Sequence, residues 1–265
     1  MDELDLDEYR RLSGKWGLSL QFVQKEFKVM DALAQVAQLS QKCGLDAVFK
    51  GGTALNKIYL RDKQRFSEDL DFDEFSGKSD SQRISSLTLL MKKITGFKVE
   101  GPWRYYDTIR FECSYSRGDF LNHARVEFRL QKRKCTLNPI GLETAVSAIA
   151  SQSVANIPCY SLDDLVARKL LALADRTEGK DVWDAYNSLG KTENIIMALE
   201  LALEAEGKKR TAGELIKQMI LELEKADAKQ MQVSTHQFIP LSIRPRNWSD
   251  LIKTLQQQLE ELTGQ

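Results

Sequence analysis

The stretch "FKGGTALNKIYLRDKQRFSEDLDF", residues 49–72, holds a glycine pair, a helical segment, a basic loop and two aspartates separated by one residue. In a strand, residues two positions apart point to the same side, so Asp69 and Asp71 are expected to share one face. Leu70 and Phe72 then point to the opposite, buried face. Two carboxylates this close repel one another and raise one another's pKa unless a cation lies between them. Mg²⁺ suits such a pair, because it binds one or two carboxylates together with substrate phosphate oxygens. The alternative is that both acids line the wet face of an edge strand.

The glycine pair points to a phosphate ligand. Gly51 and Gly52 separate a short apolar run, Ala47–Lys50, from a predicted helix, Thr53–Leu60, with Thr53 as its N-cap. Glycines at such a turn let the backbone approach a phosphate closely, and the N-terminus of the next helix offers free N–H groups. A plain tight turn uses the same residues. A phosphate cradle followed by an acid pair on the next strand, 67–73, is more informative than either feature alone.

Composition bounds the class of protein. The chain has 265 residues, enough to bury a sizeable core as one large domain or two smaller ones. Lys plus Arg and Asp plus Glu both total 38, and this balance argues against a protein that coats nucleic acid by general basic charge. No window approaches the roughly 18 apolar residues of a membrane span, and the acidic start lacks the order of a secretory signal. The four cysteines include no CxxC pair, so neither a disulfide framework nor a zinc site is indicated. We expect a cytoplasmic protein without membrane association.

Three local basic clusters lie within residues 57–65, 132–134 and 208–210. Each is expected to be a solvated face or loop, and together they leave room for a local basic surface.

Periodicity divides the chain in two. Helical spacing over Leu18–Cys43 and Ser81–Ile94 accompanies alternating patterns at 108–116 and 124–130, which a hairpin at "SRGDF" is expected to connect. These patterns predict a mixed sheet covered by helices. From residue 161 onward the patterns are helical: 161–176, 180–189, 194–207, 211–227 and 248–262. The sequence therefore predicts an α/β domain over 1–157 and a helical domain over 158–265.

Four further residues are candidates for the same site. Glu127 lies on the polar face of an otherwise apolar strand. If that strand neighbours the one with Asp69 and Asp71, three acids could hold two Mg²⁺ ions about 4 Å apart and clamp the oxygens of a displacement at phosphorus. A surface salt bridge is the alternative. Lys169 lies in the middle of the apolar face of its predicted helix. Either its side chain extends along that face so that the ammonium reaches water, or it faces a cleft and neutralises a triphosphate. Asp181 and Asp184 either close on Lys169 or are solvated.

Residues 49–72 resemble the signature of AbiEii/AbiGii-type nucleotidyltransferases, the toxins of type IV toxin–antitoxin and phage-abortive systems, within the polymerase β-like superfamily. "SLDDLVARKLLALADRTEGKDVWDAY", residues 161–186, resembles that family's second block. The resemblance implies an α+β fold: a polymerase β-like nucleotidyltransferase domain with a mixed sheet and flanking helices, followed by a C-terminal helical bundle. The stretch between the glycines and Asp69 is longer than in many members of the superfamily, a length that AbiEii-type toxins share.

The resemblance also implies residue roles. Phosphate-binding roles fall on Gly51, Gly52 and Thr53, with Ser67 as a supporting contact. Asp69 and Asp71 would be metal ligands with Glu127 as the third acid, while Lys169 would contact the triphosphate and Asp181 would complete the site.

The implied activity is Mg²⁺-dependent transfer of a nucleoside monophosphate from a nucleoside triphosphate to an acceptor hydroxyl. Relatives suggest tRNA or another RNA as the acceptor and a cognate antitoxin as a partner. Two alternatives stay open: a catalytically weak nucleotide-binding module that acts through partner binding, and a transferase that modifies an antibiotic or metabolite.

Overall fold

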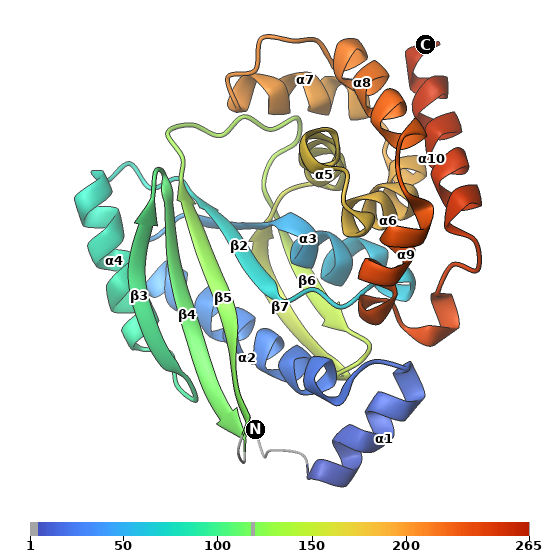
Figure 1. Cartoon of the computed structure of the whole chain (residues 1–265). Helices are drawn as coiled ribbons and strands as arrows, with labels where there is room; N and C mark the ends of the chain where they lie inside the picture. Colours follow the sequence, from blue (N-terminus) through green and yellow to red (C-terminus); the bar gives the residue numbers. More distant parts are fainter. Residues whose placement is uncertain (1–4, 118–119, 265) are drawn as a thin grey trace.

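The computed structural model describes residues 5–117 and 120–264. Within these ranges seven strands form one mixed sheet in the order β3-β4-β5-β2-β1-β7-β6 (Figure 1). The strands are β1 (Ala47–Lys50), β2 (Asp69–Glu74), β3 (Lys98–Tyr105), β4 (Thr108–Arg117), β5 (Phe120–Leu130), β6 (Gly141–Ser147) and β7 (Gln152–Cys159). β2 lies near the middle of the sheet, antiparallel to β1 and parallel to β5. A central strand therefore carries the acid pair.

Helices precede, interrupt and follow the sheet. They are α1 (Leu6–Trp16), α2 (Leu20–Lys42), α3 (Gly51–Ala54), α4 (Asp80–Lys92), α5 (Leu162–Arg176), α6 (Gly179–Ser188), α7 (Ile195–Ala205), α8 (Ala212–Glu224), α9 (Ala228–Thr235) and α10 (Trp248–Thr263). α3 continues into a π-helical turn, Leu55–Leu60, and a short 3₁₀ turn, Arg61–Lys63. Further 3₁₀ turns are Leu189–Lys191, His236–Phe238 and Leu241–Ile243. None of the helices in the described ranges is long and apolar enough to cross a membrane.

The two faces of the sheet differ. α2 packs against β5, β2 and β7, and α4 packs against β3 (Figure 1). On this covered face the ring of Phe72 lies 5.2 Å from the ring of Phe49 and 5.2 Å from that of Phe128, measured between centroids. The neighbours of Phe72 in β2 consequently point to the opposite face, as the alternation of residues 67–73 predicts. The acid pair is therefore turned toward α3, α5 and α6.

Three of the strands, β3, β6 and β7, lie outside the residue ranges expected to form strands. β6 and β7 extend the sheet beyond β1, with Phe49 of β1 in register with Cys159 of β7. Many of their side chains are half-buried or exposed, so the alternation that marks a strand in the sequence is weak here. The expected hairpin between the two alternating patterns is confirmed by the antiparallel pairing of β4 and β5. Residues 118 and 119 of its connection lie outside the described residues.

The largest apolar cluster extends from Val29 to Leu259, on both sides of residue 157. It contains core residues of α2, the sheet, α5 and α10. The division into domains at 157 and the separate C-terminal bundle stay predictions.

A charged pair is buried between α2 and the π-helical turn. Lys57 and Glu26 are both fully buried and form an ion pair, and Ser147 of β6 donates a hydrogen bond to the same carboxylate. The expectation that residues 57–65 form a solvated basic cluster is wrong for Lys57 and for Arg65, which is 4% exposed. Both have carboxylate partners from distant parts of the chain. Burial of a lysine is tolerated because such a partner compensates its charge.

We predict that Lys57→Met lowers the free energy of unfolding by about 3–5 kcal/mol, because it leaves the charge of Glu26 buried without its cation. Urea unfolding of the variant and the wild type measures the difference. The double variant Lys57→Met/Glu26→Leu, which removes both charges, should recover at least half of that loss. Equal destabilisation by the single and double variants would contradict the pair as the cause.

Candidate active site

A polar cavity of about 320 Å³ lies over the acid-bearing face of the sheet. Its lining contains seven of the nine residues that the sequence predicts for the site: Gly52, Ser67, Asp69, Asp71, Glu127, Lys169 and Asp181. The other two, Gly51 and Thr53, are not among the described residues that line it. Residues from the turn, from β2, from β5 and from α5 and α6 therefore meet at one place.

The register of the sheet places Glu127 beside the acid pair. Asp71 on β2 is the direct neighbour of Glu127 on β5, and Asp69 is the neighbour of Arg125. The condition set for the third acid, a strand adjacent to β2, is met. However, the Glu127 carboxylate is turned to β4, where it accepts a hydrogen bond of 2.7 Å from Arg110 Nε. A role for Glu127 as a metal ligand stays a prediction.

The acids differ in how far they suit a metal ion. Within the described residues, no group of three or more His, Cys, Asp or Glu side chains is arranged to hold one. The Asp69 and Asp71 side chains both offer carboxylate oxygens to the cavity. Burial raises the pKa of Asp71 to about 6, although the charge of Lys50 opposes the rise and that of Asp69 adds to it. Burial likewise raises the pKa of Asp69, against the charge of Arg125. A divalent cation would compensate both carboxylates, so the pair fits one such ion.

The glycine turn touches the acid pair directly. Gly51 has a φ of +76°, a conformation that residues with a Cβ rarely adopt. A Cβ at this position would overlap the carboxylate of Asp71. At Gly52, a Cβ would lie 2.9 Å from the guanidinium of Arg65. Glycine is thus needed at Gly51 both for the backbone conformation and for the space that Asp71 occupies.

Thr53 supports the turn from behind. The helix begins at Gly51 with Lys50 at the N-cap position, so the expectation that Thr53 caps it is wrong. The Thr53 side chain is 1% exposed, and its hydroxyl donates to the backbone carbonyl of Asp69 and lies 2.9 Å from Ser67 Oγ. These contacts hold the first residue of β2 against α3. They position Asp69, while the phosphate contact implied for Thr53 stays a prediction.

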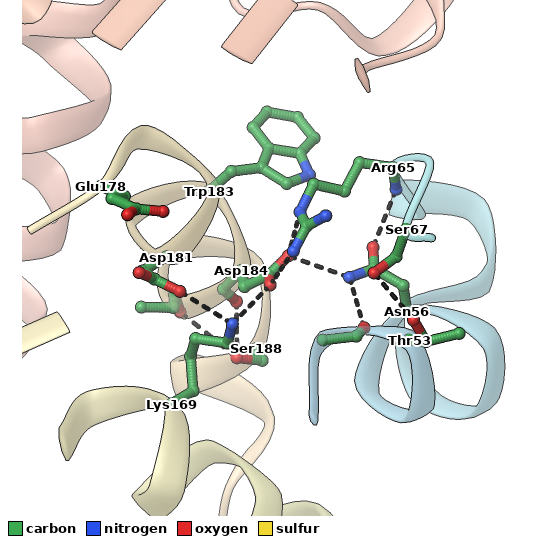
Figure 2. A network of polar contacts seen from close by, with 12 residues as sticks. Thr53, Asn56, Arg65, Ser67, Lys169, Glu178, Asp181, Trp183, Asp184 and Ser188 are labelled. Carbon is green, nitrogen blue, oxygen red and sulfur yellow. Dashed lines mark hydrogen bonds and ion pairs between the residues drawn. The ribbon is translucent and has the colours of Figure 1, made fainter. Parts of the chain in front are cut away.

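Lys169 is enclosed by two aspartates, as Figure 2 shows. Its Nζ lies 2.9 Å from Asp181 Oδ1 and 3.0 Å from Asp184 Oδ2. Burial raises the pKa of Asp181, but a hydrogen bond from Arg176 and the charge of Lys169 outweigh burial and hold that pKa below its usual range. The alternative that these aspartates close on Lys169 is confirmed, and the solvated alternative is wrong because both are fully buried. Contact between Lys169 and a triphosphate would require phosphate to replace a carboxylate.

A second ion pair joins the basic loop to α6 (Figure 2). Arg65 donates from Nε to Asp184 Oδ1 at 3.0 Å and from its terminal nitrogen to Asp184 Oδ2 at 2.7 Å. Asn56 completes the contact, since it donates to Asp184 at 3.0 Å and accepts from the backbone N–H of Arg65 at 2.8 Å. The sequence alone indicates no role for Arg65, Asn56 or Arg110. The basic loop and the acids of α6 were visible signals, but their pairing depends on the fold.

The model of a family described as "Nucleotidyl transferase AbiEii toxin, Type IV TA system" matches residues 31–261. The chain belongs to the AbiEii family. It is accordingly a nucleotidyltransferase toxin of the type found in type IV toxin–antitoxin systems. No protein of curated function matches the chain in sequence.

Solved structures share the fold. The nucleotidyltransferase toxin MenT4 from Mycobacterium tuberculosis H37Rv superposes with a TM-score of 0.64 at 18% identity, over 98% of this AbiEii chain and 90% of MenT4. JHP933 from Helicobacter pylori superposes with a TM-score of 0.54 at 16% identity, over 93% of this chain and 97% of that protein. At these identities the likeness concerns the fold, and it covers nearly all of each chain.

We predict that Gly51→Ala destabilises the protein by about 1–3 kcal/mol, because alanine is strained at positive φ and its Cβ meets Asp71. Thermal unfolding measures the loss, and Mg²⁺ titration followed by the same method should show a smaller stabilisation than in the wild type. Gly77→Ala is the matched control, since a Cβ there meets no atom within 4 Å. Equal stability of the two variants would contradict the role given to Gly51.

We predict that Asp71→Asn stabilises the metal-free protein at neutral pH. The folded-state pKa of Asp71, about 6, lies above its ordinary value of 3.8, so the ionised carboxylate costs stability above pH 6. That cost is relieved as the pH falls from about 6 to about 4. Urea unfolding in chelator should give an advantage for the variant of about 1–2 kcal/mol at pH 7.5, which shrinks toward pH 4. The exposed Asp62→Asn is the control, and an advantage that does not change with pH would contradict the assignment.

Proposed function

We propose that this AbiEii toxin transfers a nucleoside monophosphate from a nucleoside triphosphate to a hydroxyl of an RNA acceptor, with tRNA as the leading acceptor class. The observation that carries the proposal is the acid pair, Asp69 and Asp71, on one face of a central strand, in a cavity bordered by the glycine turn. Membership of the nucleotidyltransferase toxin family supports the reaction class. Action in the cytoplasm and in phage defence is part of the same proposal.

We assign metal binding to Asp69 and Asp71. Both present carboxylate oxygens to the cavity with pKa values raised by burial, which is the chemistry that a hard divalent cation compensates. Glu127 joins them if its carboxylate turns from Arg110 to its neighbour Asp71, and this is how a second ion would find a ligand. Bound Mg²⁺ would supply charge neutralisation at the phosphates and at the attacking and leaving oxygens.

The other residues of the site orient and stabilise the reactants. Gly52 and Ser67 line the cavity beside the acid pair and are assigned to the phosphates. Gly51 and Thr53 hold Asp71 and Asp69 in place from behind. Such positioning and charge compensation account for most of the acceleration in phosphoryl transfer.

The transfer step exchanges one bond to phosphorus for another. The acceptor oxygen forms a bond to the α-phosphorus, the bond between the α-phosphorus and the oxygen bridging to the β-phosphate breaks, and pyrophosphate leaves. The proton of the acceptor hydroxyl passes to Asp71 or to Glu127.

Lys169 and Asp181 are assigned to the wall of the site that faces the triphosphate. The ion pairs that Lys169 makes with Asp181 and Asp184 position the first turns of α6 beside the cavity. Exchange of a carboxylate for phosphate would bring Lys169 into direct contact with the nucleotide.

The macromolecular partners are an RNA and a cognate antitoxin. The antitoxin follows from the toxin–antitoxin family. For the RNA, the exposed cluster 132–134, which follows the end of β5, offers cations. Two of them are paired: Arg133 with Glu204 and Lys134 with Asp46. Phosphates of an RNA backbone would compete with these surface carboxylates, which hold their partners weakly.

One observation favours a second function. Glu127 is engaged with Arg110, and no three-acid cluster is formed among the described residues. This arrangement suits a nucleotide-binding module that acts through its partner without turnover. Equilibrium binding of a nucleoside triphosphate without release of pyrophosphate, with any acceptor offered, would favour it.

We predict that Asp69→Ala abolishes transfer, with at least a 100-fold loss of label incorporated into total RNA from the four α-labelled triphosphates with Mg²⁺. The reason is that one of two carboxylates that compensate the cation is lost. The thermal midpoint should change by only a few degrees, because Asp69 is half exposed. Asp62→Ala, outside the cavity, is the control and should label RNA as the wild type does. Undiminished labelling by Asp69→Ala would discard the mechanism.

A further inference from the structure

Lys180 differs from every other cation in the site cavity. Six cationic side chains line it: Arg65, Arg110, Arg125, Lys169, Arg176 and Lys180. The first five each have a carboxylate oxygen within 4 Å. Across the described residues, Lys180 has no carboxylate at that distance and no hydrogen bond from its ammonium; its one described contact is with an aromatic ring.

The contact that holds Lys180 is weak. Its Nζ lies 3.8 Å from the centroid of the Phe238 ring, and Phe238 in turn stacks on Phe22 with centroids 5.0 Å apart. A cation on a partly exposed aromatic ring gains less than it does from a charge-assisted hydrogen bond to an anion. The side chain is half-buried, so its charge is also poorly hydrated. An anion in the cavity would therefore draw the ammonium away from the ring.

The position of Lys180 on its helix points the same way. Lys180 is in the first turn of α6, a ten-residue helix. A cation there opposes the helix dipole, whereas an anion beside it is favoured by the dipole and by the lysine together. Lys180 lines the site cavity together with Asp69 and Arg65. Burial and the charge of Arg65 lower the pKa of Lys180, and the more distant carboxylates of Glu68, Asp69 and Glu178 only partly oppose this. The arrangement is unfavourable for the empty cavity and favourable for one that contains phosphate.

Lys180 also stands where two cavities adjoin. Together with Arg176 and Glu178 it lines the site cavity and a neighbouring one of about 460 Å³, between the start of α6 and the helices α8 and α9. When the α-phosphorus of a nucleotide lies at the acid pair, its β- and γ-phosphates lie within reach of the cavity wall. Lys180 is the wall cation that needs no carboxylate to leave.

We propose that Lys180 binds the pyrophosphate portion of the nucleoside triphosphate, and that its ammonium contacts the Phe238 ring when no nucleotide is bound. This assignment rests on the proposed nucleotidyltransferase function and deepens it. In the nucleotide-free protein Lys169 fixes α6 through its ion pairs with Asp181 and Asp184, and it reaches phosphate only by exchanging a carboxylate. Lys180 can bind phosphate without such an exchange.

The test compares full-length wild type with Lys180→Met, Lys180→Arg and Lys225→Met. Calorimetry with Mg²⁺ measures the Kd for inorganic triphosphate, for each of the four nucleoside triphosphates and for the four nucleosides. We expect Lys180→Met to raise the Kd for inorganic triphosphate and for the bound nucleoside triphosphate at least tenfold, with Lys180→Arg within about threefold of the wild type.

Lys225→Met is the matched control and should bind as the wild type does, since Lys225 lines only the neighbouring cavity and is paired with Glu222 at 3.1 Å. Thermal unfolding shows that each variant is folded.

The outcomes separate this proposal from the one on which it rests. Triphosphate binding by Lys180→Met within twofold of the wild type would overturn the role of Lys180 and leave the transferase standing. A tenfold loss in a folded Lys180→Met, without transfer of label to RNA by the wild type, would support the role of Lys180 and count against the transferase. Absence of triphosphate binding by the wild type would overturn both. A loss in Lys180→Met that Lys180→Arg does not restore would also count against a phosphate contact.

Discussion

The buried ion pair between Arg65 and Asp184 is the contact on which the site depends. It joins the loop before β2 to α6, two segments 119 residues apart in sequence. Breaking such a pair leaves a charge in a medium that solvates it poorly, which is more costly than losing a surface contact. The pair therefore holds α6 against the sheet in one position. Because Lys180 and Asp181 begin that helix, the same contact brings them to the cavity that the acid pair faces from β2.

The glycine turn works mainly through what lies beside it. Gly51 leaves room for the Asp71 carboxylate, and Thr53 holds the backbone of Asp69. Residues 49–72 contain an open turn, a helix and paired acids. These features lie together because the acids pack directly against the turn. The basic loop between them supplies Arg65, which ties this unit to α6. Four features that look separate in the sequence thus pack together at one place in the fold.

The charges of the cavity describe the ligand that it suits. Its acid pair has raised pKa values, so it favours a cation, while one lysine at its wall has no carboxylate, so it favours an anion. The two requirements are met together by a divalent cation with a polyphosphate. This combination accords with a nucleotidyltransferase toxin, and it arises from side chains whose charges the rest of the protein compensates only in part.

The sequence by itself determined the features that depend on near neighbours in the chain. Alternation placed Asp69 and Asp71 on one face, helical spacing turned Lys169 inward, and residues 49–72 indicated the AbiEii family. Only the tertiary structure decided that Lys57 and Arg65 are buried, that Glu127 faces Arg110, and that β6 and β7 complete the sheet. Periodicity reports which side of an element is apolar, since that is a local property. Which charge meets which depends on how distant elements pack. This packing encloses Lys169 between Asp181 and Asp184 and leaves Lys180, among the described residues, without a carboxylate within 4 Å.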